Sequence, residues 1–305
     1  MTSYFGVDHR LVAAGGVALA CGLTAIGTYK LVHGSGGHGH GHGKGHAHGP
    51  GVSFGGKKDM FFNFHYATPE SLRVFDCIPI EDLDAPTRIV NMCIKHWSQQ
   101  KQAGKDIPSR AIDVGCNVGG FSFRLAKGFN EVVGIDMNQD SLDIAQHMKE
   151  KGGREYTIEV EGEIKKKVMG VVPKEIDRSR VTFMQADACN PPPNLGQFGC
   201  VLICNVLHHV EKPRVFLHGL RDLLVPGGIF VMVEQFRWNY GDAKREDWIG
   251  GQYIDGEPVM SWPTLQKELS NDFELLEHCD TNLIAPECYR IYLHMVVKVS
   301  AWRRK

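Results

Sequence analysis

Residues 110–126 read Arg110-Ala-Ile-Asp-Val-Gly-Cys-Asn-Val-Gly-Gly-Phe-Ser-Phe-Arg-Leu-Ala126, and this stretch decides the fold. It begins with a short apolar run typical of a strand (111–114), continues through a glycine-rich turn (115–120) and opens an amphipathic helix (121–126). Glycine lets the backbone approach a ligand closely, and the start of a helix offers free N–H groups. The stretch therefore predicts a corner that binds a nucleotide-like ligand.

The residues that follow alternate between strand-like and helix-like runs. Near-continuous apolar strands separated by helices predict a parallel sheet that is covered on both faces. The end of the chain departs from this alternation, because one helix is followed by two strands that can close on each other. A further helix is expected to begin near Thr68, and the insertion 153–180 should form a β-hairpin. We expect strands at 131–136, 180–185, 199–205, 228–234, 273–279 and 289–300, and helices at 85–102, 139–151, 213–224 and 262–269.

The spacing within the glycine turn separates two classes of nucleotide-binding protein. It reads Asp113-x-Gly115-x-Asn117-x-Gly119, which is not the spacing Gly-x-Gly-x-x-Gly of dinucleotide enzymes. The turn resembles motif I of the class I S-adenosylmethionine-dependent methyltransferases, Asp/Glu-x-Gly-x-Gly-x-Gly, with Asn117 in place of the middle glycine. Segments after the second, third and fourth strands, and 224–229 before the fifth, match the same family in order.

This resemblance implies an α/β fold with a Rossmann-like, mostly parallel seven-stranded sheet, helices on both faces, and S-adenosylmethionine as the cofactor. The acidic residue that ends the second strand would accept hydrogen bonds from the ribose hydroxyls. The acid after the third strand would pair with the adenine amino group, and residues after the fourth would face the methionine part and the methyl acceptor. The expected cofactor-binding residues are Asp113, Gly115, Asn117, Gly119, Asp136, Met137, Asp187, Ala188 and Asn205.

The chemistry of methyl transfer needs little covalent help from the protein. A sulfonium methyl group is already activated, so the protein mainly aligns the acceptor lone pair with the methyl–sulfur bond. A general base is needed only where the acceptor carries a proton. His208, His209 and Glu234 stand at strand ends where such a base would lie, and one of the two histidines is expected to be a structural contact. The nine cysteines contain no Cys-x-x-Cys pair, so no metal site is expected.

Segments beyond the shared fold resemble a narrower family, the methyltransferase domain fused to 5-histidylcysteine sulfoxide synthases in ovothiol biosynthesis. The matching segments are 64–66, 161–163, 187–198, 248–251 and 299–304, and the resemblance covers roughly 60–304. It implies N-methylation of an imidazole in a mercaptohistidine-like substrate. The alternatives are methylation of histidine in His-x-His protein segments, methylation of another small nitrogen or sulfur acceptor, and a catalytically silent, membrane-tethered binding subunit.

One segment departs from that family in a way that bears on the acceptor. Residues 286–291 read Pro-Glu-Cys-Tyr-Arg-Ile, whereas the relatives carry a more basic Arg-Glu-x-x-Arg-Lys stretch. The retained Glu287 and Arg290 could pair the ammonium and carboxylate of an amino-acid substrate, or could form a surface ion pair. The residues expected to bind the substrate are His65, Tyr66, Trp248, Glu287 and Arg290.

The N-terminal region differs in composition from the rest of the chain. Leu11 to Tyr29 carries no charge, and 19 helical residues span about 28 Å, roughly the hydrocarbon thickness of a bilayer. We expect a membrane anchor with the enzyme domain on the cytosolic side; a cleaved signal or organellar targeting segment is the alternative. Residues 33–56 are a glycine- and histidine-rich linker. The predicted division is therefore 1–32, 33–56 and a methyltransferase domain at 57–305.

The charge balance bears on the partners. The chain has 34 basic and 35 acidic residues, so it carries no strong electrostatic footprint for nucleic acid. We expect a small-molecule substrate and, through the N-terminal segment, a membrane. Nothing in the sequence indicates an oligomeric state.

Overall fold

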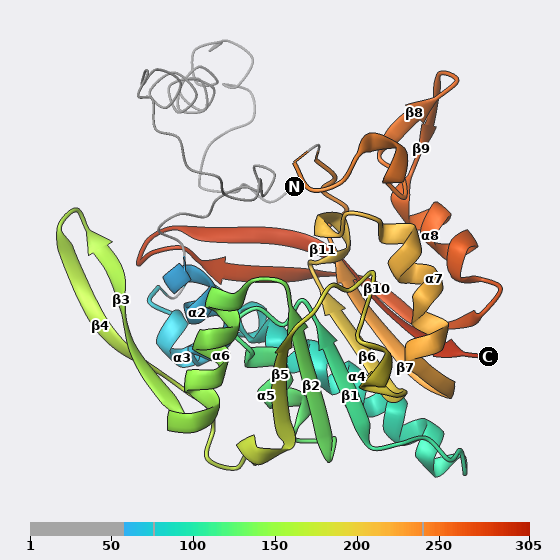
Figure 1. Ribbon diagram of the computed structural model, residues 1–305. Helices are drawn as coiled ribbons and strands as arrows, with labels where there is room; N and C mark the ends of the chain where they lie inside the picture. The colour runs from blue at the N-terminus through green and yellow to red at the C-terminus, as the bar shows by residue number, and fades with distance from the viewer. Residues whose placement is uncertain (1–57, 76, 240) are drawn as a thin grey trace, which may run out of the picture. The chain divides into compact units, whose positions relative to one another are not determined.

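The computed structural model describes residues 58–75, 77–239 and 241–305, and its centre is a seven-stranded sheet in the order β10-β11-β7-β6-β1-β2-β5 (Figure 1). Strands β7, β6, β1, β2 and β5 run parallel, whereas β11 pairs antiparallel with both β7 and β10. The predicted class I sheet with two terminal strands closing on each other is confirmed. The sheet strands are β1 Arg110–Val114, β2 Glu131–Asp136, β5 Val181–Gln185, β6 Phe198–Cys204, β7 Leu224–Glu234, β10 Phe273–Pro286 and β11 Tyr292–Arg304.

Helices cover both faces of this sheet. On one face, α4, α5 and α6 share a core with inward side chains such as Cys200, Leu202 and Val231. On the other face, α7 and α8 pack on Val201, Phe230 and their neighbours. The helices are α2 Lys58–Tyr66, α3 Pro69–Leu72, α4 Ala85–Gln102, α5 Gly120–Leu125, α6 Gln139–Lys151, α7 Pro213–Leu223 and α8 Ser261–Leu269.

The order of the strands creates the binding edge. From β1 the chain moves outward to β2 and β5, then returns to β6 on the other side of β1. The connections that follow β1 and β6 therefore leave the sheet in opposite directions, and ligands of open α/β sheets bind in the crevice at such a reversal. Most of the predicted site residues lie at or just after the carboxyl ends of β1, β2, β5, β6 and β7, whereas His65 and Tyr66 belong to the segment before β1.

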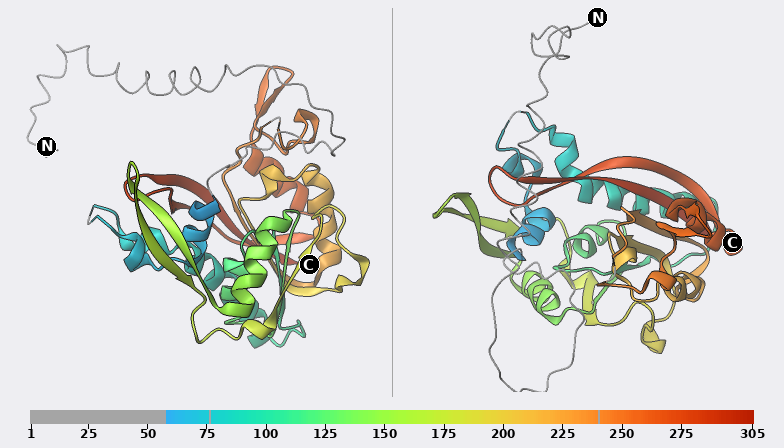
Figure 2. Two further views of the ribbon diagram at one scale, coloured as in Figure 1. Left: turned by 60° about the vertical axis from the view of Figure 1, so that its left-hand side comes forward. Right: turned by 90° about the horizontal axis from the view of Figure 1, so that it is seen from above.

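Two long hairpins, β3–β4 and β10–β11, extend from the same side of the molecule (Figure 1). The predicted insertion hairpin is present as β3 (Gly153–Glu161) and β4 (Ile164–Val171). The β10–β11 hairpin is longer than predicted: its two strands pair from Phe273 with Arg304 to Pro286 with Tyr292, and Figure 2 shows it running far past the sheet. A third, short hairpin is formed by β8 (Gln252–Ile254) and β9 (Glu257–Val259).

The segment before α4 is more helical than predicted. The aromatic run 61–66 itself forms α2, and the predicted helix near Thr68 is the short α3, where Thr68 Oγ1 accepts a hydrogen bond from Ser71 N–H at 3.3 Å. Phe62 and Tyr66 are buried, and their rings lie 4.7 Å apart between centroids in a tilted arrangement. Helix α2 is therefore part of the core.

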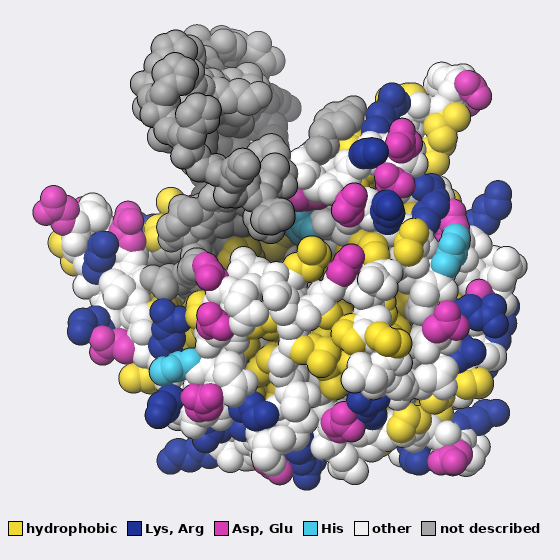
Figure 3. Space-filling view, viewed as in Figure 1, with side chains coloured by type: hydrophobic (Ala, Val, Ile, Leu, Met, Phe, Trp, Pro, Cys, Tyr) yellow, Lys and Arg dark blue, Asp and Glu magenta, His cyan; other side chains and the backbone are white. Residues whose placement is uncertain are grey.

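The predicted membrane anchor and histidine-rich linker lie at 1–32 and 33–56, outside the described residues, so both stay predictions. None of the helices in the described ranges combines the length and the apolar character that crossing a bilayer needs. On the face shown in Figure 3, acidic and basic side chains are interspersed rather than gathered by sign.

Candidate active site

The glycine turn after β1 uses the left-handed backbone region three times. Gly115, Asn117 and Gly119 have φ angles of 72°, 49° and 85°. A Cβ atom on Gly115 would collide with the Val206 side chain, and one on Gly119 would lie 2.6 Å from Phe183. Asparagine is among the residues that tolerate this region best. Asn117 therefore preserves the turn that the family's middle glycine would form.

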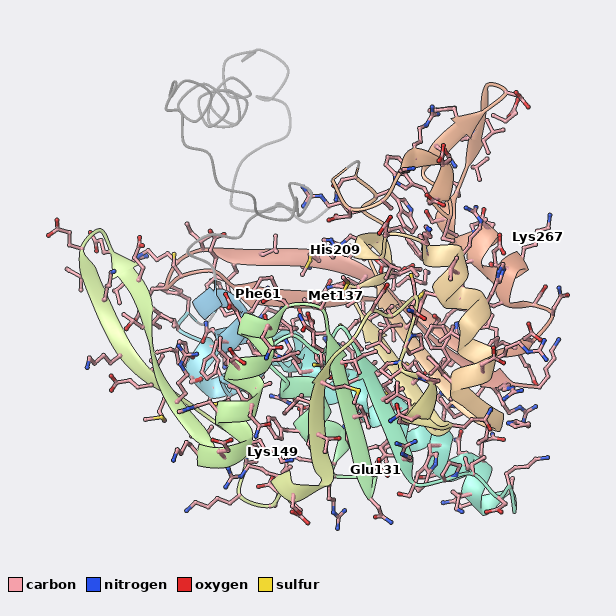
Figure 4. All side chains as sticks on the ribbon, viewed as in Figure 1. Phe61, Glu131, Met137, Lys149, His209 and Lys267 are labelled. Carbon is pink, nitrogen blue, oxygen red and sulfur yellow. The ribbon has the colours of Figure 1, made fainter. Side chains whose placement is uncertain are left out.

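Asp136 ties the turn to the end of β2. Its Oδ2 accepts the backbone N–H of Asn117 and its Oδ1 that of Asn138, both at 2.8 Å. The half-buried carboxylate is thereby fixed at the edge of the sheet. Met137, with 67% of its surface exposed, follows it, and Figure 4 shows Met137 at the same end of the sheet as His209 and at the opposite end from Glu131.

Asp113 supports the turn from beneath. It is buried, and its Oδ2 accepts the Ser122 hydroxyl at 2.6 Å. Burial raises the pKa of this carboxyl to about 7, although the Ser122 hydrogen bond opposes the shift. The structure thus places Asp113 in the core, where its hydrogen bond to Ser122 of α5 holds together the strand and the helix on either side of the glycine turn.

Helix α2 closes the turn from the other side. The Gly120 N–H donates to His65 Nδ1 at 3.1 Å, and the Tyr66 hydroxyl donates to the carbonyl of Val118. The expectation that the start of α5 offers free N–H groups is therefore wrong for Gly120. Burial, together with the nearby positive charge of Arg124, lowers the pKa of His65 to about 3. The imidazole therefore stays neutral and can accept the hydrogen bond from Gly120 N–H. The structure brings His65 and Tyr66, both predicted to face the substrate, against the cofactor turn.

The connections after β5 and β6 complete the cofactor edge. Asp187 is exposed and its Oδ1 accepts the Cys189 N–H at 2.8 Å, while Ala188 is half-buried. Asn205 has φ 54°, and its N–H donates to the Val233 carbonyl at 2.8 Å. Its side-chain Oδ1 is buried and has no hydrogen-bond partner among the described residues. The turn has no room for Cβ atoms, which fits a cofactor that approaches the backbone closely, and the unpaired Asn205 oxygen indicates a hydrogen-bond donor from a bound ligand.

The comparisons with known proteins agree with this geometry. Residues 112–232 match the family model described as "Methyltransferase domain". The chain is 27% identical over 150 residues to the ubiquinone biosynthesis O-methyltransferase of Actinobacillus pleuropneumoniae serotype 7, covering 47% of this chain and 53% of that protein. It is 29% identical over 135 residues to the protein of the same name from Dinoroseobacter shibae, covering 42% and 44%. The chain thus spans about half the length of these relatives.

A solved structure with a similar arrangement is the magnesium protoporphyrin IX methyltransferase of Synechocystis PCC 6803 with bound SAM. It is 15% identical, has a TM-score of 0.44, and the match covers 82% of this chain and 97% of that one. Sheet order, turn geometry and the family match define the class: the chain carries a class I S-adenosylmethionine-dependent methyltransferase domain. Its cofactor is S-adenosylmethionine.

The three predicted catalytic residues belong to two hydrogen-bonded pairs, one of which is completed by Asp242. His208 is buried, its Nδ1 lies 2.6 Å from Glu234 Oε1, and its Nε2 lies 3.3 Å from the Gln235 amide nitrogen. His209 has 42% of its side chain exposed, and its Nδ1 lies 2.8 Å from Asp242 Oδ2. The two imidazoles lie 4.0 Å apart between ring centroids.

The exposed pair has the geometry of a general base. The carboxylate of Asp242 binds Nδ1–H of His209, so the lone pair stands on Nε2 of a half-exposed ring. Burial and the neighbouring His208 lower the pKa of His209, against the opposing effect of Asp242, and so keep it neutral near pH 7. Sequence reasoning missed Asp242, because it lies in the connection after β7 and belongs to no motif.

The other predicted substrate contacts lie in two different places. Trp248 is buried, its indole N–H donates to the Ala243 carbonyl at 3.1 Å, and its ring stacks on Trp238 at 6.5 Å. Glu287 and Arg290 lie at the tip of the β10–β11 hairpin, where Arg290 covers the Phe75 ring at 5.0 Å. These contacts favour a packing role for Trp248.

The strand register places the hairpin tip far from the histidines. Glu234 is paired with Lys298, and the hairpin continues six residues further, to Tyr292. At about 3.3 Å per residue, this corresponds to roughly 20 Å. The structure therefore does not bring Glu287 and Arg290 together with His208 and Glu234.

Proposed function

We propose that this domain transfers a methyl group from S-adenosylmethionine to an imidazole nitrogen of a small, mercaptohistidine-like acceptor, with His209 as the general base. The observation that supports this most strongly is the His209–Asp242 pair, at 2.8 Å, beside the cofactor edge. A base with a free Nε2 lone pair on a half-exposed ring is useful only for an acceptor that carries a proton.

The bound cofactor supplies a methyl group on a positively charged sulfur, so the protein needs to align the acceptor and manage its proton. A neutral imidazole has a lone pair on one nitrogen and a proton on the other. His209 Nε2 accepts a hydrogen bond from that N–H and takes the proton as the other nitrogen bonds to the methyl carbon. The cofactor would supply the methyl group, and its sulfur would keep the electron pair of the methyl–sulfur bond. Asp242 holds the imidazole of His209 in the required tautomer and stabilises its protonated form.

The buried pair has a different role in this scheme. Glu234 Oε1 accepts the N–H groups of Gln235 at 2.8 Å and Phe236 at 3.0 Å as well as Nδ1–H of His208. This network fixes the start of the connection that carries Asp242. His208 and Glu234 therefore position the exposed base, and His208 is the structural member of the two histidines.

A second candidate function is O-methylation of a small hydroxyl-bearing acceptor. The same base suits an O–H group, and the two matched relatives are named O-methyltransferases. Methylation of His-x-His protein segments is a further alternative, in which the histidines at 33–56 could themselves be acceptors.

The experiment is a transfer assay with radiolabelled S-adenosylmethionine, the purified full chain and separate acceptors. The panel holds 4-mercaptohistidine, histidine, carnosine, a His-x-His peptide and a catechol. We expect label on the free imidazole amino acids and most on 4-mercaptohistidine. Label on the catechol alone would favour the O-methyl alternative, label on the peptide alone the protein alternative, and label on none of them would contradict the proposal.

The placement of the enzyme in the cell is part of the same proposal. We place the domain on the cytosolic side of a membrane, held by residues 1–32, because 11–29 is uncharged and more basic residues follow it (Lys44, Lys57 and Lys58) than precede it (Arg10). Fractionation tests this: full-length chain should pellet with membranes and be released by detergent, and a fully soluble chain would contradict the anchor.

A further inference from the structure

Glu234 carries one crowded and one unused side-chain oxygen. Oε1 accepts hydrogen bonds from His208 Nδ1 at 2.6 Å, Gln235 N–H at 2.8 Å and Phe236 N–H at 3.0 Å. Oε2 is buried and has no hydrogen-bond partner among residues 58–75, 77–239 and 241–305, and the residue as a whole is 0% exposed. A buried carboxylate oxygen without a donor is costly, so it points to a donor from a ligand.

Asn205 presents the same feature on the neighbouring strand. The β6–β7 register pairs Cys204 with Val233, so Asn205 and Glu234 are the next residues on adjacent strands, about 5 Å apart. In the described part of the chain, Asn205 and Glu234 are the two residues with a buried side-chain oxygen that has no hydrogen-bond partner. Both Asn205 and Phe236, two residues after Glu234, adopt positive φ angles, of 54° and 56°. For Phe236 this is a strained conformation of the kind that persists at binding sites.

The order of the strands indicates whether the cofactor or the methyl acceptor supplies this hydrogen-bond donor. The glycine turn follows β1, and Asp136, the acid expected to bind ribose, ends β2, whereas β7 lies beyond β6 on the other side of β1. Glu234 is thus two strands away from the glycine turn, on the side opposite β2 and β5, where the adenosine part of the cofactor is expected. A group that reaches Glu234 Oε2 therefore belongs to the methyl acceptor.

We infer that Glu234 Oε2 and Asn205 Oδ1 form a subsite for a primary ammonium group of the methyl acceptor. This rests on the proposed function, and it identifies the acceptor as an imidazole that carries an alkylammonium chain. An ammonium is compact and has three donors, so it can serve both oxygens, and its charge complements the carboxylate. The subsite replaces the hairpin-tip residues Glu287 and Arg290 as the place where the amino group is recognised.

Binding of two probes tests this subsite without requiring turnover. Histamine carries an imidazole and an ethylammonium chain, and 4-propylimidazole has the same shape with a methyl group in place of the ammonium. Titration calorimetry measures the Kd of each for the full chain saturated with the demethylated cofactor. We expect histamine to bind at least tenfold more tightly than 4-propylimidazole.

Two substitutions and one control locate the effect. Glu234→Gln keeps an oxygen for the three existing donors and should weaken histamine about tenfold or more, with 4-propylimidazole unchanged within about twofold. Asn205→Gly removes the amide at a position where glycine accepts the φ angle, so it should weaken histamine several-fold even if the glutamine variant folds poorly. Glu246→Gln removes an exposed carboxylate paired with Lys244 at 4.0 Å and should change neither probe.

Several results would overturn the assignment. Equal Kd values of the two probes for the unsubstituted chain, or equal losses of both in Glu234→Gln and Asn205→Gly, show that no ammonium subsite exists there. Loss of histamine affinity in Glu287→Gln instead returns recognition to the hairpin tip. If Glu234→Gln and Asn205→Gly bind the demethylated cofactor more weakly but bind methylthioadenosine, which lacks the amino-acid part, as before, the hydrogen-bond donor belongs to the cofactor. Failure of imidazole methylation in the transfer assay contradicts the proposed function separately, because the probe titrations involve no transfer.

Discussion

His209 Nδ1 lies 2.8 Å from Asp242 Oδ2, and this contact joins the connection after β6 to the connection after β7. The carboxylate determines which imidazole nitrogen carries the proton and leaves Nε2 as the acceptor. Asp242 is itself held by the Asn239 side-chain amide. The pair therefore provides an oriented base beside the cofactor edge.

Removing this base should slow transfer without weakening the cofactor. His209→Gln is expected to lower kcat by about 10²–10⁴-fold, the usual contribution of general base catalysis, and Asp242→Asn by less. The Kd of S-adenosylmethionine should stay within about twofold by titration calorimetry. His218→Gln, which removes an exposed histidine of α7 that is paired with Glu268 of α8, is the matched control. Normal turnover by His209→Gln would show that the base lies elsewhere.

The pH dependence of kcat/KM should report His209. Burial and His208 lower its pKa below 6.5, and the base must be neutral to act, so activity should be retained at pH 6.5 and fall only as the pH drops through the lowered pKa. Asp242 opposes this shift, so Asp242→Asn should move the acidic limb to still lower pH. An acidic limb above pH 6.5, or one that does not respond to Asp242→Asn, would be inconsistent with this assignment.

Asn117 should be replaceable by glycine but not by a β-branched residue. Its φ of 49° suits glycine, whereas valine in this region costs roughly 1–3 kcal/mol. We expect Asn117→Gly to bind S-adenosylmethionine with nearly unchanged Kd and Asn117→Val to bind it about tenfold more weakly. A large loss in Asn117→Gly would mean that the asparagine side chain itself contacts the cofactor.

The stability of the fold should reveal the neutral state of His65. Its pKa is lowered from 6.5 to about 3 in the folded protein, so the unfolded chain binds an extra proton below pH 6.5. His65 therefore favours unfolding increasingly as the pH falls from 6.5 towards 3, by up to about 1.4 kcal/mol per pH unit.

Asp113 acts in the opposite sense over nearly the same range. Its pKa is raised from 3.8 to about 7, so its contribution to stability is largest at low pH and is lost as the pH rises through this interval.

Comparing His65→Gln with the unsubstituted chain isolates the contribution of His65, because Asp113 is present in both. We expect urea unfolding to show that the difference in unfolding free energy between the two chains shifts by about 2 kcal/mol in favour of the variant between pH 8 and pH 5. A difference that does not change with pH would mean that the pKa of His65 is the same in the folded and the unfolded protein.

The sequence allowed the fold to be predicted almost completely, because the apolar strands and capped helices are local patterns. The helix at 139–151 and the strand at 131–136 occur at the predicted residues. The helical nature of 61–66 was missed, since its aromatic residues suit a strand equally well and only packing against Gly170 and Val118 selects the helix.

The site was predictable only where a motif carries it. Asp136 and Asn205 lie at strand ends and could be named from spacing, but Asp242 could not, because its role depends on a contact 33 residues away in sequence. Glu287 and Arg290 were named from resemblance. The length of the β10–β11 hairpin, which no local pattern gives, places them away from the histidines.

The central claim is that the acceptor atom is an imidazole nitrogen and that His209 takes its proton. The most direct measurement uses 4-mercaptohistidine with S-adenosylmethionine carrying a ¹³C-methyl group, followed by NMR of the product. The account predicts that the new methyl carbon is bonded to a ring nitrogen and that His209→Gln forms this product at least about a hundredfold more slowly. A methyl group on sulfur, or unchanged product formation by His209→Gln, would contradict it.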